Sequence, residues 1–113
     1  MDCIFCQIAA GKVPSQILYQ DEKVIAFRDI NPQAPVHVLV IPKKHIPALT
    51  HLSEADTPLA GHMITIANQV AKSEGIAKSG YRLVISCGKG GGQVVPHLHL
   101  HLLGGRQLSN AFD

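Results

Sequence analysis

The chain has 113 residues, a net charge of +2 at neutral pH and a hydrophobic fraction of 46%. This length suffices for a buried core without disulfides, so we expect one domain over residues 1–113. Basic residues are scattered, and no apolar run approaches the roughly 20 residues of a membrane span, which argues against a nucleic-acid or membrane partner. Three cysteines without a secretory signal predict a cytoplasmic protein whose cysteines are free thiols or metal ligands.

The first half of the chain predicts a short helix followed by three strands. Residues 3–10 show helical apolar spacing and precede Gly11, which is typical of a helix end. Residues 17–19 and 24–27 are apolar runs around a polar loop, which is the pattern of a hairpin. Residues 36–41 form a continuous apolar run, so we expect a strand that is buried on both faces.

The second half predicts one long helix and two strands around a glycine-rich loop. Residues 53–56 resemble a capping box, and the helix that follows keeps apolar spacing as far as Gly75. Strands are expected over residues 81–86 and from about 97 to 103, on either side of the loop 88–92. These elements predict an α+β fold with a mainly antiparallel sheet, one long helix and one short helix.

Three histidines alternate with leucines in the last expected strand, at His97, His99 and His101. Alternate residues of a strand share a face, so the imidazoles point one way and the leucines point into the core. Three imidazoles on one face need polar partners, and packing alone explains them poorly. Two interpretations remain: a zinc site on the strand, or catalysis by one imidazole whose neighbours fix its tautomer and supply a proton.

The loop directly before this strand favours catalysis. Residues 88–93 contain four glycines, whose backbone N–H groups can surround an anion. A glycine loop alone also fits a plain connection between strands, and this loop lacks the spacing of a Walker motif. Its position before three histidines nevertheless points to a phosphate.

The pair Cys3 and Cys6 has the spacing of half a zinc site. One such motif is incomplete, and it also describes a redox pair or two ordinary thiols on a helix. The second half of a zinc site would have to come from elsewhere in the fold.

Together these features resemble the histidine triad family. The segment His97–Leu103 resembles the family signature of alternating histidine and hydrophobic residues. Further matching segments occur in family order over nearly the whole chain, at residues 4–5, 27–30, 31–37, 41–45, 91–93 and 103–106. Within the family, the chain resembles the purine nucleoside phosphoramidases, also called histidine triad nucleotide-binding proteins.

This resemblance implies a homodimer whose central strands continue one sheet. It also implies an enzyme that binds a purine nucleoside monophosphate moiety and hydrolyses its phosphoramidates or related nucleotidyl conjugates at the α-phosphorus. His99 would attack the phosphorus and form a nucleotidyl-histidine intermediate. His101 would contact the phosphate and assist the leaving group, with His97 and His37 in support.

The resemblance also implies the residues that contact the substrate. Asp29 would hold the ribose hydroxyls. The base would lie between apolar side chains, namely Ile4, Phe5, Ile8, Phe27 and Ile30. The phosphate and leaving group would lie near Gly92, Gln93, Val94 and Ser86.

A subset of the family carries a CxxC motif that binds zinc. In that subset the remaining ligands are the histidine after Pro-Lys-x and the first histidine of the triad, here His45 and His97. The resemblance therefore implies a structural zinc site formed by Cys3, Cys6, His45 and His97.

Two positions depart from the phosphoramidase pattern. Related enzymes carry serine where this chain has Val94 and asparagine where it has Ser86. A second hypothesis therefore stays open, a purine-nucleotide-binding regulatory protein with weak or vestigial catalysis, although the intact His99 and His101 argue against it. A third hypothesis, a metalloenzyme with zinc on all three strand histidines, lacks a nearby carboxylate partner and competes with the CxxC motif for His97.

Overall fold

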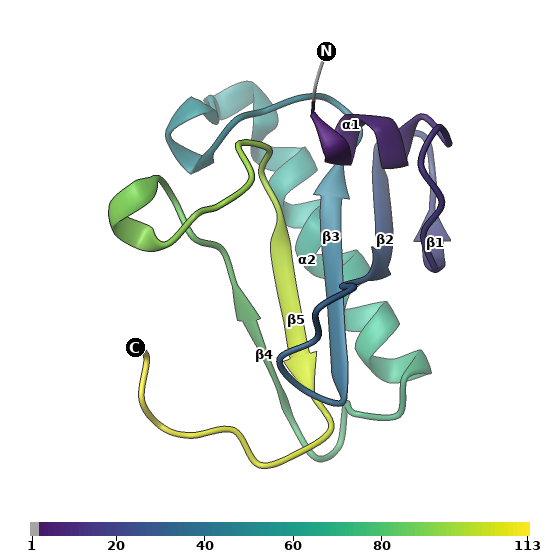
Figure 1. Ribbon diagram of the computed structural model, residues 1–113, viewed down its shortest axis with the longest axis vertical. Helices are drawn as coiled ribbons and strands as arrows, with labels where there is room; N and C mark the ends of the chain where they lie inside the picture. Colours follow the sequence, from purple (N-terminus) through teal and green to yellow (C-terminus); the bar gives the residue numbers. More distant parts are fainter. Residues whose placement is uncertain (1–2) are drawn as a thin grey trace.

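The structure, a computed structural model, describes residues 3–113 (Figure 1). Five strands form one antiparallel sheet in the order β1-β2-β3-β5-β4, which confirms the expected α+β class. Within residues 3–113 no helix combines the length and apolar character that a membrane crossing requires. The elements in chain order are α1 (Ile4–Ala9), β1 (Ile17–Gln20), β2 (Val24–Arg28), β3 (Val36–Pro42), η1 (Leu49–His51), η2 (Glu54–Asp56), α2 (Thr57–Ser73), β4 (Tyr81–Val84), η3 (Lys89–Gly91) and β5 (Leu100–Gly104).

Local signals set the ends of both helices. Helix α1 begins after Cys3, whose Sγ accepts the Cys6 N–H at 3.3 Å, and Gly11 follows it with a φ of +75°. Asp56 Oδ2 accepts the Ser53 N–H at 3.0 Å, so the expected capping interaction is present. It opens the 3₁₀ turn η2, and α2 follows three residues later than the sequence predicts.

The sheet separates two hydrophobic cores, and β3 is buried on both faces as expected. On one face, α2 packs against Val38, Val40, Leu100 and other residues. On the opposite face, Phe5 and Ile8 of α1 pack against apolar residues of β2 and β3. In Figure 1, α2 lies behind the sheet and α1 lies in front of it, near one end of β3.

The histidine-bearing segment alternates as predicted, but its regular strand is shorter. Leu98, Leu100 and Leu102 are buried in the core on the α2 side, while His101 pairs with Leu39 on the α1 side. The strand begins at Leu100 instead of residue 97, because the Leu98 N–H is donated to Ile46 O at 2.6 Å, outside the ladder. Strand β4 likewise ends at Val84, two residues before the predicted end.

Candidate active site

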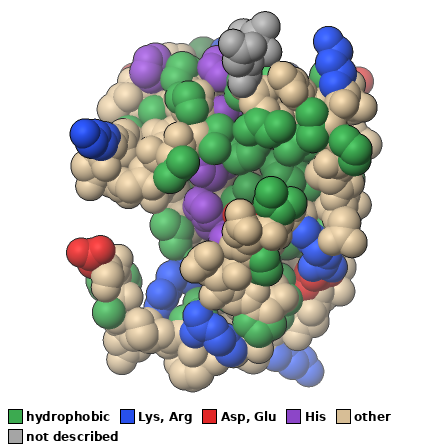
Figure 2. All heavy atoms as spheres, in the orientation of Figure 1, with side chains coloured by type: hydrophobic (Ala, Val, Ile, Leu, Met, Phe, Trp, Pro, Cys, Tyr) green, Lys and Arg blue, Asp and Glu red, His purple; other side chains and the backbone are tan. Residues whose placement is uncertain are grey.

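A cavity of about 460 Å³ opens on the α1 side of the sheet. Histidine side chains run in a row across this face, beside a hydrophobic patch (Figure 2). One group of wall residues is apolar and comprises Ile4, Phe5, Ile8, Phe27, Ile30 and Leu39. The other walls are polar side chains or the glycine loop and its neighbours, namely Arg28, Asp29, Asn31, Gln33, His37, His99, His101, Gly92, Val94 and Val95.

His99 is held in one tautomer. Its Nδ1 lies 2.7 Å from the main-chain oxygen of His97, and a carbonyl oxygen only accepts. Nδ1 therefore carries a hydrogen, and in the neutral ring the lone pair is on Nε2. The ring is buried and lies edge-on to Phe5, with 5.1 Å between the ring centroids. A neutral imidazole with a free Nε2 lone pair is a nucleophile.

His37 and His101 form a second oriented pair. The Gln33 N–H is donated to His37 Nδ1 at 3.0 Å, so His37 carries its hydrogen on Nε2. That Nε2 lies 2.9 Å from His101 Nδ1, to which it donates. His101 therefore carries its own hydrogen on Nε2. Burial, reinforced by His99 and His37, lowers the pKa of His101 to about 4, so the ring is neutral near pH 7.

Asp29 connects the polar turn to this histidine pair. Its Oδ1 accepts the Asn31 N–H at 2.8 Å, and its Oδ2 lies 3.4 Å from His37 Nε2. The carboxylate is partly exposed to the cavity, where its free lone pairs suit hydroxyl donors. The adjacent Ile30 is 88% exposed, so it offers an apolar surface at the rim.

The glycine loop is more closed than the sequence predicts. The amides of Gly91, Gly92 and Gln93 are donated to carbonyls of residues 88 and 89, because the loop winds into the 3₁₀ turn η3. The expectation of a cradle of free amides is therefore wrong for these three N–H groups. Gly92, with a φ of +85°, still lines the cavity.

The structure places two expected phosphate contacts outside the cavity wall. The Gln93 side chain closes the loop, because Nε2 is donated to Pro47 O at 2.7 Å and Oε1 accepts the Gly88 N–H at 2.8 Å. Ser86 is the second residue after β4, and its main chain lies close to Gly91. Val94 does line the cavity, and it is 90% exposed.

A cluster of sulfur and nitrogen donors lies beside the cavity. The donor atoms of Cys3, Cys6, His45 and His97 lie within 4.8 Å of one another. Cys3 Sγ is 3.3 Å from His97 Nδ1, and His45 Nδ1 is 3.2 Å from Cys6 Sγ and 3.1 Å from His97 Nδ1. Two thiols and two imidazoles that converge in this way could hold a metal ion.

The orientation of His97 supports this fit. Its Nε2 lies 2.8 Å from the main-chain oxygen of Pro42, so Nε2 carries the hydrogen and Nδ1 directs its lone pair at the thiols. A ligating histidine usually donates its other ring N–H in this way. The donor set fits zinc, which prefers sulfur and nitrogen ligands in tetrahedral geometry.

Asp29, His37 and His101 also lie within 4.8 Å of one another. Here the hydrogen bonds oppose a metal, because the Gln33 N–H occupies His37 Nδ1 and Nε2 must keep its hydrogen. The three triad histidines do not converge either. The side chain of His97 points at the cysteine cluster, and His99 Nδ1 points at the main-chain oxygen of His97. His101 Nδ1 points at His37. The hypothesis of a single zinc on all three histidines therefore finds no geometric support.

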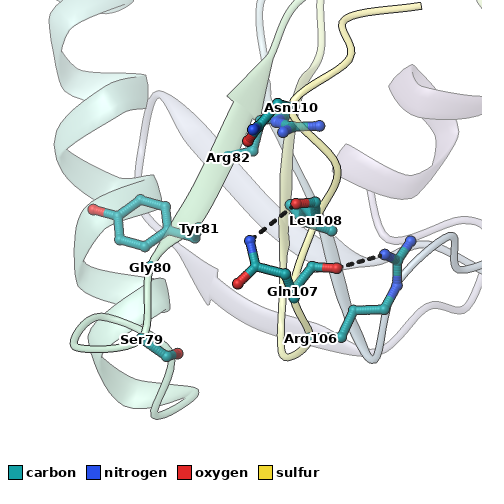
Figure 3. Close-up of a pocket in the computed structure, with 8 residues that line it drawn as sticks. All are labelled: Ser79, Gly80, Tyr81, Arg82, Arg106, Gln107, Leu108 and Asn110. Atoms are coloured by element: carbon teal, nitrogen blue, oxygen red, sulfur yellow. Dashed lines mark hydrogen bonds between the residues drawn. The ribbon is translucent and has the colours of Figure 1, made fainter.

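A smaller hollow of about 210 Å³ lies between the start of β4 and the C-terminal segment (Figure 3). Its cationic groups already have partners. Arg106 Nη1 donates to Gln107 O at 3.2 Å, and Arg82 donates to the main-chain oxygen of Ser109. We therefore assign the chemistry to the histidine-lined cavity.

The fold and this cavity define a histidine triad protein. A family model described as the HIT domain matches residues 10–108, and the chain belongs to the histidine triad (HIT) family. The purine nucleoside phosphoramidase of Escherichia coli (strain K12) is 50% identical over 107 residues, which cover 95% of this chain and 90% of the relative. Protein HitA of Neisseria gonorrhoeae is 46% identical over 103 residues, which cover 91% and 95%, respectively.

Solved structures agree with this family. A HIT family hydrolase from Clostridium thermocellum superposes with a TM-score of 0.96 at 48% identity, covering 98% of this chain and 96% of the other. A histidine triad protein from Clostridium difficile gives a TM-score of 0.96 at 45% identity, with the same coverage.

Proposed function

We propose that this chain hydrolyses nucleoside 5'-phosphoramidates, or related nucleotidyl conjugates, and that it takes a purine nucleoside in the apolar part of the cavity. The fixed tautomer of His99 carries this proposal, because it leaves Nε2 as a neutral nucleophile in the cavity wall. The relative named purine nucleoside phosphoramidase supports the substrate class.

The cavity offers a place for each part of such a substrate. The base lies between Phe5, Ile8 and Phe27, where an aromatic ring gains apolar contact. Asp29 accepts hydrogen bonds from the ribose hydroxyls. This places the α-phosphate beside His99 and His101, with Gly92 at the edge.

In the first step, His99 Nε2 attacks the phosphorus. The bond between phosphorus and the leaving nitrogen breaks, and its electron pair stays on that nitrogen. The bound phosphate carries negative charge, which favours uptake of a proton by the His37–His101 pair. This proton passes to the departing nitrogen, which leaves as a neutral amine.

In the second step, water attacks the phosphorus of the nucleotidyl-histidine intermediate. A proton of this water returns to the His37–His101 pair, and the bond from phosphorus to His99 Nε2 breaks. The electron pair returns to Nε2. The His97 carbonyl holds the Nδ1–H throughout, and this stabilises the positive charge on the ring of the intermediate.

Zinc, if bound by Cys3, Cys6, His45 and His97, would supply a structural cross-link. These residues come from the start of α1, the segment after β3 and the segment before β5. The cross-link would hold α1, and with it the wall residue Phe5, against the catalytic segment.

A rapid-quench experiment tests this function. The protein is mixed with the adenosine 5'-phosphoramidate of methylamine, and the reaction is quenched with a denaturant at non-acidic pH. The protein is then digested to peptides. We expect one adenylyl group on the peptide that contains His99. Turnover without an adduct, or an adduct on another residue, would refute the mechanism.

A second candidate is nucleotide binding without efficient turnover, as in a regulatory protein. The side chain of Val94 favours it, because a valine in the cavity wall offers no hydroxyl to the leaving group. The same experiment separates the candidates: tight binding of AMP with hydrolysis no faster than in buffer would favour regulation.

A further inference from the structure

A second cavity, of about 520 Å³, adjoins the site cavity. The two cavities share three wall residues, Ile4, Val94 and Val95. We call the second cavity the side cavity. Its remaining walls are Cys3, His45, Pro47 and Pro96.

The side cavity differs in chemistry from the cavity that it adjoins. Among the described residues that line it there is no Lys, Arg, Asp or Glu, whereas the site cavity contains Arg28 and Asp29. Five of its seven wall residues are aliphatic or proline. Val94 stands at the boundary and is 90% exposed, although it is a β-branched apolar side chain. An apolar ligand would cover this surface and remove it from water.

The order of groups in the substrate decides what reaches the side cavity. The nucleoside extends from the phosphate toward Phe27 and Asp29, and the phosphate lies beside His99 and His101. The group on the other side of the scissile bond must extend away from the nucleoside. Val94 lines both cavities, together with Ile4 and Val95, so the leaving group can reach the side cavity along this shared wall.

We propose that the side cavity binds the leaving group and selects conjugates of apolar amines, such as arylalkylamines. This inference rests on the proposed function. A charged leaving group would lose hydration against the aliphatic wall and find no ionic side chain among the described wall residues, which makes its binding costly. An aryl ring would instead pack on Val94, Pro47 and Pro96, and this contact would tighten binding of the substrate.

Two adenosine 5'-phosphoramidates test this proposal, one of phenethylamine and one of ethanolamine. The two amines have similar basicity, so they are leaving groups of similar quality. They differ in the area of their apolar surface. We expect kcat/KM for the phenethylamine conjugate to be about 10-fold higher, mainly through a lower KM, which is the low end of the effect of one methylene group in an apolar pocket. Equal values for the two conjugates would overturn the inference.

A pair of proline variants locates the effect. Pro47→Glu places a carboxylate in the wall, and its main-chain oxygen can still accept from Gln93. We expect this variant to abolish the preference for phenethylamine. Pro14→Glu, the same change at an exposed proline before β1, should preserve it. Preservation of the preference in Pro47→Glu would overturn the inference. Hydrolysis of neither conjugate by the wild-type protein would overturn the proposed function, and this inference with it.

Discussion

His97 supplies the main-chain oxygen that holds His99 Nδ1 at 2.7 Å, while its own side chain lies in the cysteine cluster. One residue thus takes part in both the candidate metal centre and the orientation of the candidate nucleophile. Displacement of the His97 side chain would move the main-chain carbonyl of His97. The hydrogen bond that fixes the tautomer of His99 would then be lost.

His99→Ala should abolish hydrolysis while AMP still binds, because the apolar wall and Asp29 remain. Loss of a covalent nucleophile should lower kcat by at least about 10³-fold. Steady-state kinetics and calorimetric titration with AMP check both parts. His51→Ala, at an exposed histidine of η1, serves as the control. More than a few per cent of wild-type kcat in His99→Ala would refute the assignment of the nucleophile.

We expect one zinc ion per subunit in protein purified without chelator, as measured by elemental analysis. The double variant Cys3→Ser, Cys6→Ser should lose the metal and melt at a lower temperature, because two of the four ligands are removed. Cys87→Ser, which changes a cysteine outside the cluster, should keep both the metal and the Tm. Zinc that survives in the double variant would contradict the assignment.

AMP binding should be accompanied by proton uptake at pH 6. In the free protein, burial lowers the pKa of His101 to about 4, so its ring is neutral at this pH. The bound phosphate is negative and raises that pKa, so His101 holds more protons in the bound form, and this contribution tightens AMP binding as the pH falls from 7 to 6. Calorimetry in two buffers of different ionisation enthalpy measures the uptake. An apparent binding enthalpy that is the same in both buffers would refute the proton uptake. The variant His101→Gln should take up fewer protons than the wild type.

Val94→Ser should accelerate hydrolysis of conjugates with poor leaving groups. A hydroxyl beside the scissile bond can relay a proton to the departing nitrogen, and valine cannot. For the methylamine conjugate, which is too short to fill the side cavity, we expect kcat to rise about 10-fold or more, with little change in KM. A conjugate of an activated phenol should react at an unchanged rate. Equal acceleration of both conjugates, or of neither, would show that residue 94 has no role toward the leaving group.

The protein should be a homodimer at micromolar concentration. Strand β4 is at the edge of the sheet, and an unpaired edge is usually covered. Pairing with the same strand of a second copy would cover it and continue the sheet. Light scattering should give twice the chain mass of 12.1 kDa, and a monomer mass would refute this prediction.

Local patterns predicted much of this molecule. The apolar run 36–41 gave β3, and the alternation of histidine with leucine gave the correct faces around β5, because side-chain periodicity follows directly from backbone geometry. The ligand set of His45 with Cys3 and Cys6 came from family resemblance, since the CxxC motif alone left its partners open.

Contacts between distant segments escaped prediction. The hydrogen bond from Leu98 N–H to Ile46 O shortens the last strand. The side chain of Gln93 donates a hydrogen bond to Pro47 O, 46 residues away in the sequence. The Gln33 N–H that sets the tautomer of His37 is a backbone group, so its role left no mark in the residue type. Its only signal was the proline-rich turn beside a histidine.

The two-sided burial of β3 has a consequence for protein engineering. None of the described residues buried in the core on the α2 side lines the site cavity or the side cavity. Substitutions in that core would change the melting temperature and leave the residues that line both cavities unchanged. A library confined to the wall residues 4, 5, 8, 30 and 94–96 would instead sample new substrates on a constant scaffold. The sheet therefore divides the chain into two sets of positions that selection could change independently.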